Sequence, residues 1–291
     1  MPDMSSPRLF PIVLLSLFLC LVSATAGNFY QDIDVLFGDW RTQILQGGEL
    51  ITLSLDKASG AGFRSKNEYL YGRFDMRMKL VGGDSAGTVT TFYMSSQGPT
   101  HNEIDLEFLG NSSGDPYVVH TNVILQGKGG KEQEFYLWFD PTKDFHLYSI
   151  VWNPKNIILL VDEVPIRVYR NWGTKGVRYP SDQPMKMYAT LWDAEDWATQ
   201  GGRVKTDWSK APFIASYKGY NASACVWPSS SSNCPSSSPT PGNEWQSQTL
   251  GVKGRNMLRW VQKKYMIYNY CTDFKRYPRR LPRECRKSRF L

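Results

Sequence analysis

The sequence predicts an all-β protein, an antiparallel β-sandwich of the jelly-roll type followed by a C-terminal extension that contains one helix. Short segments of alternating polar and apolar residues recur at roughly even spacing, and Gly, Pro, Asn or Asp separates nearly all of them. Helical periodicity is rare in this part of the chain. The composition, 41% hydrophobic and 21% charged, is that of a globular protein with a sizeable core and excludes global disorder.

The main unit is expected over residues 27–215. Its predicted strands cover residues 50–55, 71–80, 88–94, 103–109, 134–139, 146–152, 156–161, 166–169 and 186–191.

The C-terminal extension is expected over residues 216–291. Its first part, 228–241, is rich in Ser and Pro and predicts an exposed loop. Beyond it, apolar residues recur at helix-like intervals, which predicts one amphipathic helix followed by a stapled tail. These residues are Met257, Leu258, Val261, Tyr265 and Tyr268.

The first residues, 1–26, predict a signal peptide and therefore a secreted protein. Arg8 precedes an apolar run over 9–22, and the small residues 24–26 follow as a cleavage site. A membrane anchor is the alternative, but the run is shorter than the roughly 20 residues that span a bilayer. We therefore expect no membrane association.

The cysteines suit an oxidising compartment. Loss of the signal peptide removes Cys20 and leaves an even set, Cys225, Cys234, Cys271 and Cys285. Short loops favour Cys225 with Cys234 and Cys271 with Cys285, although the sequence allows three pairings. Zinc ligation would require closer Cys or His pairs. Asn111 and Asn221 begin sequons and are candidate glycan sites.

The formal charge of +7 is concentrated in the tail. Residues 275–289 hold many Lys and Arg and one acidic residue, Glu284. In a secreted chain we expect no nucleic-acid partner. The tail is interpreted either as a solvated basic segment or as a weak contact for acidic polysaccharide.

The segment HNEIDLEFLG, residues 101–110, carries the strongest sign of chemistry. Period-two alternation places Glu103, Asp105 and Glu107 on one strand face and three apolar residues on the other. Three like charges in a row disfavour folding, and such conflicts are typical of functional sites. An acidic face in water and a calcium site are the alternatives.

Strand geometry indicates what the carboxylates can do. Four residues of strand separate the Cα atoms of Glu103 and Glu107 by about 13 Å. Their carboxyl groups would then lie roughly 5 to 6 Å apart, close to the spacing of retaining glycosidases, although the larger inverting spacing stays open. Asp105 between them is expected to help separate the pKa values of the two glutamates.

HNEIDLEFLGN resembles the ExDxE signature of glycoside hydrolase family 16, in particular the plant xyloglucan endotransglucosylase/hydrolases. The resemblance extends over most of the mature chain, through YLYGRFDMRMKLVGGDSAGTVTTFYMSS, HTNV, LWDAEDWATQGGRVKTDWSKAPF and WVQKKYMIYNYCTD. It implies a concanavalin-like jelly roll with an open cleft. It also implies that Glu103 is the nucleophile, Glu107 the acid/base and Asp105 the helper.

The resemblance implies a set of substrate-binding residues besides Glu107. They are His120, Thr121, Asn122, Gly130, Lys131, Glu132, Asp196, Trp197, Gly202 and Arg276. Each has a structural alternative: a strand residue, a solvated hairpin, or part of the basic tail. Glu134 departs from the Arg or Gln usual in the family, which affects the expected recognition of side-chain sugars.

The expected function is retaining transfer between xyloglucan donor and acceptor chains in the cell wall and apoplast, by a monomer without metal or other cofactor. Hydrolysis of xyloglucan and a mixed-linkage glucanase are alternatives that use the same carboxylates. A non-catalytic lectin is the rival from another class, but simple sugar binding does not need three carboxylates.

Overall fold

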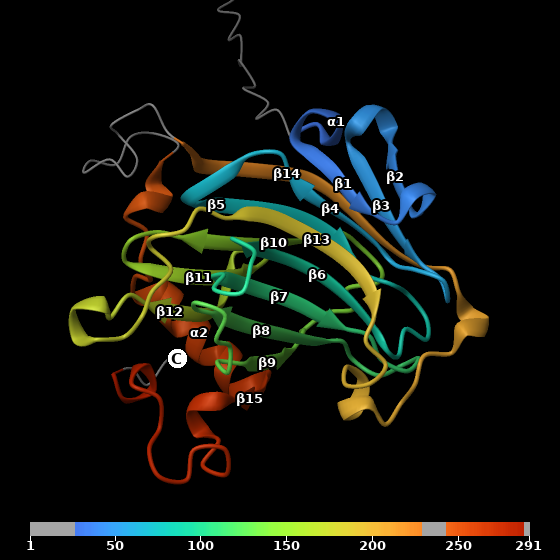
Figure 1. Cartoon of the computed structure of the whole chain (residues 1–291). Helices are drawn as coiled ribbons and strands as arrows, with labels where there is room; N and C mark the ends of the chain where they lie inside the picture. The colour runs from blue at the N-terminus through green and yellow to red at the C-terminus, as the bar shows by residue number, and fades with distance from the viewer. Residues whose placement is uncertain (1–26, 229–242, 288–291) are drawn as a thin grey trace, which may run out of the picture.

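The computed structural model describes residues 27–228 and 243–287, which form two antiparallel sheets packed face to face (Figure 1). The expected signal peptide, Cys234 and most of the Ser/Pro-rich loop lie outside the described residues. Among the helices that are described, none is long and apolar enough to cross a membrane.

One sheet has eight strands. In spatial order they are β1 (Ile33–Phe37), β4 (Ala61–Ser65), β13 (Lys186–Asp193), β6 (Thr88–Ser95), β7 (Glu103–Leu109), β8 (Val118–Ile124), β9 (Gln133–Tyr136) and β15 (Met266–Asn269).

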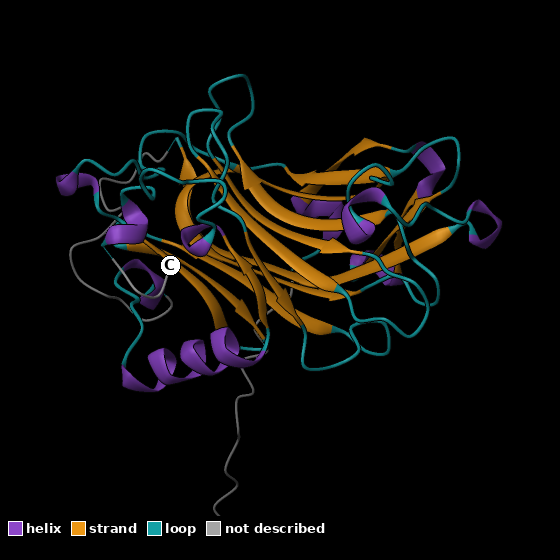
Figure 2. Cartoon of the chain, turned by 90° about the horizontal axis from the view of Figure 1, so that it is seen from below, coloured by secondary structure: helices purple, strands orange, loops and turns teal. Residues whose placement is uncertain are grey.

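The other sheet has seven strands and packs against the first. In spatial order they are β12 (Val164–Arg170), β11 (Asn156–Val161), β10 (His146–Trp152), β5 (Glu68–Lys79), β14 (Phe213–Trp227), β3 (Leu50–Leu55) and β2 (Thr42–Leu45). The helices are α1 (Phe29–Asp32) and α2 (Val252–Lys264), and short 3₁₀ turns join several elements. Figure 2 shows the strands of the two sheets as two stacked layers.

The predicted fold class is confirmed, and β3, β7, β10 and β11 have the bounds expected from alternation. Strands β1, β2, β4, β8, β14 and β15 were not predicted. Strand β8 alternates buried and half-exposed side chains. The polar His120 and Asn122 therefore lie on the half-exposed face of β8, opposite its buried face.

Strand β14 continues past Ala215, the expected end of the main unit, as far as Trp227. The alternation that would reveal it is broken at Gly219, whose φ of +62° lies in the left-handed region. The register with β5 shifts at this point, so Tyr217 and Tyr220 are both buried. A bulge of this kind hides a strand from a period-two search.

The predicted helix ends earlier than its apolar pattern suggests. Tyr265 caps α2 with non-helical dihedral angles, and Tyr268 lies in β15 instead. Strand β15 pairs with β9 and forms the edge of the eight-stranded sheet, and this pairing gives the backbone of β15 its hydrogen-bond partners. The helix packs on β12, with Leu258 and Val261 buried.

The apolar face of β7 anchors the carboxylate strand in the core. Ile104, Leu106 and Phe108 are fully buried. The ring of Phe108 packs edge-on against Tyr148 of the opposite sheet, with centroids 4.6 Å apart. A one-residue slip of β7 would bury its carboxylates instead, so this packing fixes the register.

The expected disulfide between Cys271 and Cys285 is present. It ties the tail to the segment that follows β15. We expect the double variant Cys271→Ser/Cys285→Ser to lose about 3 kcal/mol of unfolding free energy, because a bond across a separation of 14 residues restricts the unfolded chain. Urea unfolding measures this loss. The exposed substitution Thr272→Ser is the control, and a double variant within about 0.5 kcal/mol of wild type would contradict the expectation.

Candidate active site

The three carboxylates of β7 lie on the outer face of the eight-stranded sheet and line a hollow of about 220 Å³. We call this hollow the carboxylate cleft. Its walls come from β6, β7 and β13. They consist of Thr91, Tyr93, Glu103, Asp105, Glu107, Thr190 and Trp192.

The central carboxyl is the most deeply buried of the three. Asp105 is 5% exposed, whereas the side chains of Glu103 and Glu107 are 19% and 22% exposed. Burial raises the pKa of Asp105 well above its usual range, and the charges of Glu103 and Glu107 raise it further. Asp105 therefore keeps its proton more firmly than an ordinary aspartate.

The pKa of Glu103 is also raised, first by burial and then by the charge of Glu107. Hydrogen bonds from Ser95 and Asp105 oppose this rise because they stabilise the carboxylate form. Nε2 of His101 lies 3.8 Å from a Glu103 carboxyl oxygen, and the charge of His101, when protonated, also lowers the pKa of Glu103. Glu103 and Asp105 share a hydrogen bond, so the protonation of one carboxyl group depends on that of the other.

Glu107 and His120 form a direct contact across two strands. They are register partners in β7 and β8, and His120 Nδ1 lies 2.7 Å from Glu107 Oε2. Trp197 packs edge-on against His120 with ring centroids 6.0 Å apart. The imidazole thus holds the Glu107 carboxyl in one orientation.

Glu107 and His120 belong to a row of register partners that crosses the sheet. Away from the cleft this row continues through Glu134 of β9 and Tyr268 of β15. Glu134 is the register partner of both His120 and Tyr268. Burial raises the pKa of Glu134, and the neighbouring Glu132 adds to the rise while His120 opposes it. The residue that departs from the family pattern therefore faces the partner of Glu107.

Thr121 and Asn122 point to opposite sides of β8. Asn122 is the register partner of Asp105 on the outer face. Thr121 is fully buried on the core face, where its hydroxyl donates to Gln133 O at 2.9 Å. The Thr121 side chain therefore supports the sheet from inside the sandwich, and its expected part in substrate binding stays a prediction.

Arg167 of β12 is the cation beneath this sheet, and sequence reasoning missed it. It is 2% exposed and donates to Thr121 O and Oγ1 at 2.9 Å and to Lys131 O at 2.5 Å. The available sign was the position of Arg167 within a run of residues that are otherwise apolar or aromatic and buried. A cation buried in such a strand needs several hydrogen-bond acceptors around it.

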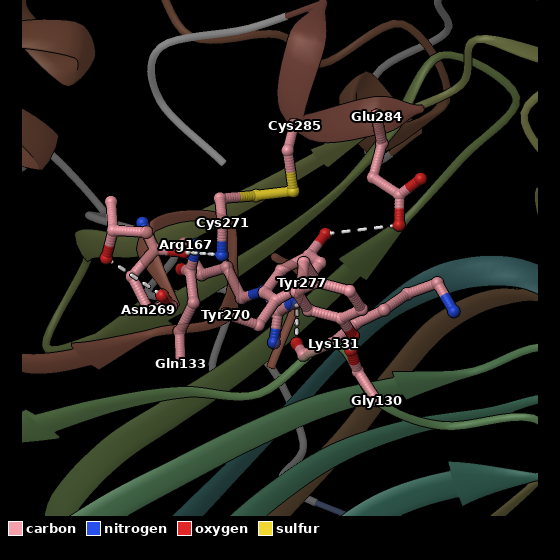
Figure 3. The surroundings of a disulfide bond; sticks show 11 residues. Gly130, Lys131, Gln133, Arg167, Asn269, Tyr270, Cys271, Tyr277, Glu284 and Cys285 are labelled. Carbon is pink, nitrogen blue, oxygen red and sulfur yellow. Dashed lines mark hydrogen bonds between the residues drawn. A yellow bond between two sulfur atoms is a disulfide. The ribbon is translucent and has the colours of Figure 1, made fainter. Parts of the chain in front are cut away.

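The predicted substrate-binding residues Gly130, Lys131 and Glu132 lie in the turn before β9, but they do not share the same neighbours. Glu132 forms an ion pair with Arg276 at 2.6 Å, and Gly130 O accepts from Tyr277 at 3.0 Å. Lys131 instead lines a separate hollow beside the C-terminal tail. Figure 3 shows its side chain extending on the side of Glu284. The Lys131 side chain thus lies outside the carboxylate cleft, and its expected part in substrate binding stays a prediction.

The loop after β13 carries the other predicted residues. Trp197 is 39% exposed beside His120 and Trp192. Asp196 points to solvent and pairs with Lys205 at 3.2 Å. Gly202 has a φ of +82°, and a Cβ there would lie 2.0 Å from Asp196 O. Gly202 therefore allows the loop to close behind Trp197, and its expected contact with sugar stays a prediction.

Sequence reasoning also missed the aromatic wall of the cleft. The rings of Tyr93 and Tyr188 stack with centroids 5.1 Å apart, and Tyr93 is the register partner of Asp105. Flat ring faces beside polar groups suit sugar rings. The alternation of Thr91, Tyr93 and Ser95 along β6 was the available signal.

The sequons lie apart from the cleft. Asn111 follows β7, and Asn221 is exposed on β14. Among the described residues, no group of three His, Cys, Asp or Glu side chains is arranged to hold a metal ion.

An antiparallel jelly roll with three adjacent carboxyl groups on one strand of an aromatic-walled cleft defines a glycoside hydrolase acting on a polysaccharide. Solved structures with this fold include a prokaryotic β-1,3-1,4-glucanase (lichenase) derived from a mouse hindgut metagenome. It shares 25% identity with a TM-score of 0.54 over 67% of this chain and 96% of its own. The β-glucanase of Bacillus licheniformis matches in fold with a TM-score of 0.52 and 24% identity, over 66% of this chain and 91% of its own.

Residues 29–210 match the model of glycosyl hydrolases family 16, and residues 239–285 match that of the xyloglucan endo-transglycosylase (XET) C-terminus. Xyloglucan endotransglucosylase protein 1 of Diospyros kaki is 61% identical over 93% of this chain and 92% of its own. A probable xyloglucan endotransglucosylase/hydrolase of Arabidopsis thaliana, protein 16, is 57% identical over 95% and 97%. The chain belongs to glycosyl hydrolases family 16, in its xyloglucan endotransglucosylase/hydrolase branch.

Proposed function

We propose that this protein is a retaining xyloglucan endotransglucosylase. It cleaves the β-1,4-glucan backbone of one xyloglucan chain and transfers the glycosyl group to another, in the construction or remodelling of the cell wall. The observation that carries the proposal is the row of Glu103, Asp105 and Glu107 in one cleft, with Glu107 held by His120. The names of the relatives support the choice of substrate.

In the first step, Glu103 attacks the anomeric carbon and the bond from that carbon to the glycosidic oxygen breaks. Glu107 gives its proton to the departing oxygen, which leaves as a 4-hydroxyl. In the second step, a 4-hydroxyl of the acceptor gives its proton to Glu107. Its oxygen then displaces Glu103 from the anomeric carbon, and both glutamates return to their starting state.

Asp105 keeps the nucleophile ionised. Its proton is firmly held by burial, and it hydrogen-bonds Glu103. This bond favours the Glu103 carboxylate that attacks the sugar and opposes the effect of burial.

Two variants of Asp105 test this role through pH. We expect the acid limb of kcat/KM to move to higher pH in Asp105→Ala, because loss of the donor raises the pKa of Glu103. Asp105→Asn keeps an N–H donor and serves as the matched control, with its limb near the wild-type position. The proposed role of Asp105 would be wrong if the acid limb moved equally in the two variants. It would also be wrong if the acid limb of Asp105→Ala moved to lower pH.

Transfer and hydrolysis are separated by an acceptor assay. Purified protein receives xyloglucan with and without a labelled xyloglucan oligosaccharide. Label in long chains is the expected result, and reducing ends without label incorporation would replace transferase with endohydrolase. Faster turnover of a mixed-linkage glucan would favour a glucanase, and binding without turnover would favour a lectin.

The remaining assignments complete the proposal. The protein acts outside the cell, in the wall and apoplast, as a monomer with glycans at Asn111 and Asn221. Trp197, Asn122, Glu132 and Arg276 contribute to xyloglucan binding. The basic tail contributes a weak contact with acidic wall polysaccharide.

A further inference from the structure

Three hollows that share Arg178 in their walls lie apart from the carboxylate cleft. Their volumes are about 340, 710 and 150 Å³. They are bordered by the segment between β12 and β13, the turn before β9 and the C-terminal tail. None of their lining residues belongs to the carboxylate cleft. We call these connected walls the Arg178 groove.

The Arg178 groove is strongly basic. Its basic side chains are Lys128, Lys131, Lys155, Arg178 and Arg283. The ion pairs found within the described ranges of the chain involve none of them.

The acidic side chains in its walls are Asp182 and Glu284, and both already accept hydrogen bonds. Asp182 accepts from Asn102 at 3.1 Å, and Glu284 accepts from the Tyr270 hydroxyl at 3.4 Å. The cations of the groove therefore outnumber the carboxylates.

Tertiary structure brings these cations together. The disulfide of Cys285 and the contact of Glu284 with Tyr270 hold the tail against the sheet (Figure 3). Arg283 donates from this fixed segment to Gly176 O at 3.3 Å. Gly176 has a φ of +71°, and a Cβ there would lie 2.8 Å from Arg283 Nη1. Glycine at 176 thus permits both the turn and the approach of the guanidinium.

The convergence of like charges opposes folding. Burial lowers the pKa of Lys131, and the charges of Arg167 and Arg178 lower it further, while Glu284 opposes them. Such conflicts are typical of functional sites, and a bound anion would relieve this one.

The ligand is identified by its charge and shape. Guanidinium groups bind carboxylates through paired hydrogen bonds, and cations distributed over successive hollows suit a linear ligand with repeated carboxylates. Asn171, Thr174 and Ser181 line the same walls and suit sugar hydroxyls. The disulfide beside the groove places it in an oxidising compartment, which disfavours nucleic acid.

We propose that the Arg178 groove binds a linear uronate-bearing polysaccharide and so holds the enzyme near an acidic polymer while the carboxylate cleft acts on neutral xyloglucan. This deepens the tail contact proposed above and rests on the extracellular location given there, not on the catalytic roles.

Calorimetric titration with de-esterified oligogalacturonate tests the groove. We expect Arg178→Gln/Arg283→Gln to weaken binding roughly tenfold. The control Lys210→Gln/Lys253→Gln removes the same charge from two exposed lysines outside the groove and should keep near wild-type affinity. If the arginine pair lowers stability, the exposed Lys155→Gln alone should still weaken binding, by a smaller factor.

Equal loss of affinity in the control would reduce the effect to net charge and overturn the proposal. Equal binding of the methyl-esterified oligomer, or no binding at low salt, would also overturn it. Stronger binding to phosphatidylserine vesicles that the arginine variant loses would assign the groove to a membrane surface instead. Transfer on xyloglucan should be unchanged in every variant, so failure of this proposal leaves the catalytic one intact.

Discussion

Glu103→Ala is expected to slow glycosyl transfer by at least about 10⁴-fold while leaving xyloglucan binding in place. The substitution removes the group that forms the covalent intermediate, and no other carboxylate can take its position. Asp105 is buried and holds its proton, and Glu107 is bonded to His120. The rate is measured with xyloglucan and a labelled acceptor, and binding by affinity electrophoresis.

The exposed Glu49→Gln is the matched control and should keep wild-type activity. A sharper readout uses azide and a donor with an aryl leaving group. In Glu103→Ala, azide can occupy the place of the missing carboxylate and should yield an α-glycosyl azide. Formation of the β-product by this variant, or turnover near the wild-type rate, would contradict the role of Glu103 as nucleophile.

Glu107→Ala is expected to slow reaction with xyloglucan by about 10²- to 10⁴-fold, the usual contribution of a general acid. With a nitrophenyl donor the loss in forming the glycosyl-enzyme should be much smaller, because nitrophenolate leaves without a proton. The measured quantity is the ratio of the two losses. Azide should then give the β-product, since Glu103 still forms the intermediate.

Glu134→Gln provides the control on the same row of side chains. It removes a carboxylate that faces His120 rather than the cleft. We expect the ratio between xyloglucan and nitrophenyl donors to stay as in the wild type. An equal loss on both donors in Glu107→Ala would assign Glu107 to substrate binding rather than proton transfer.

The carboxylate strand was predictable in detail because its evidence is local. Alternation over 103–109 requires only the period of a strand, and it identifies both the buried face and the carboxylate face. The unpredicted β14 and β15 depend on a bulge at Gly219 and on pairing with the edge of β9. Neither feature is present in the local pattern of the chain.

The substrate-binding set shows the same division. Resemblance grouped Thr121 with His120 and Lys131 with Glu132, but neighbours in a strand or turn face opposite sides. Thr121 therefore entered the core, and Lys131 turned to the tail. Tyr93 lines the cleft, with Tyr188 stacked on its ring, only because of the register of their strands.

The sequence by itself determined the jelly-roll class, the common face of Glu103, Asp105 and Glu107, and the candidate pairing of Cys271 with Cys285. Tertiary structure alone decided that His120 holds Glu107, that Arg276 pairs with Glu132, and that Arg178 and four other cations line one groove. The physical reason is range. Side-chain alternation and short-loop closure act over a few residues, whereas these contacts depend on the register and packing of segments far apart in the chain.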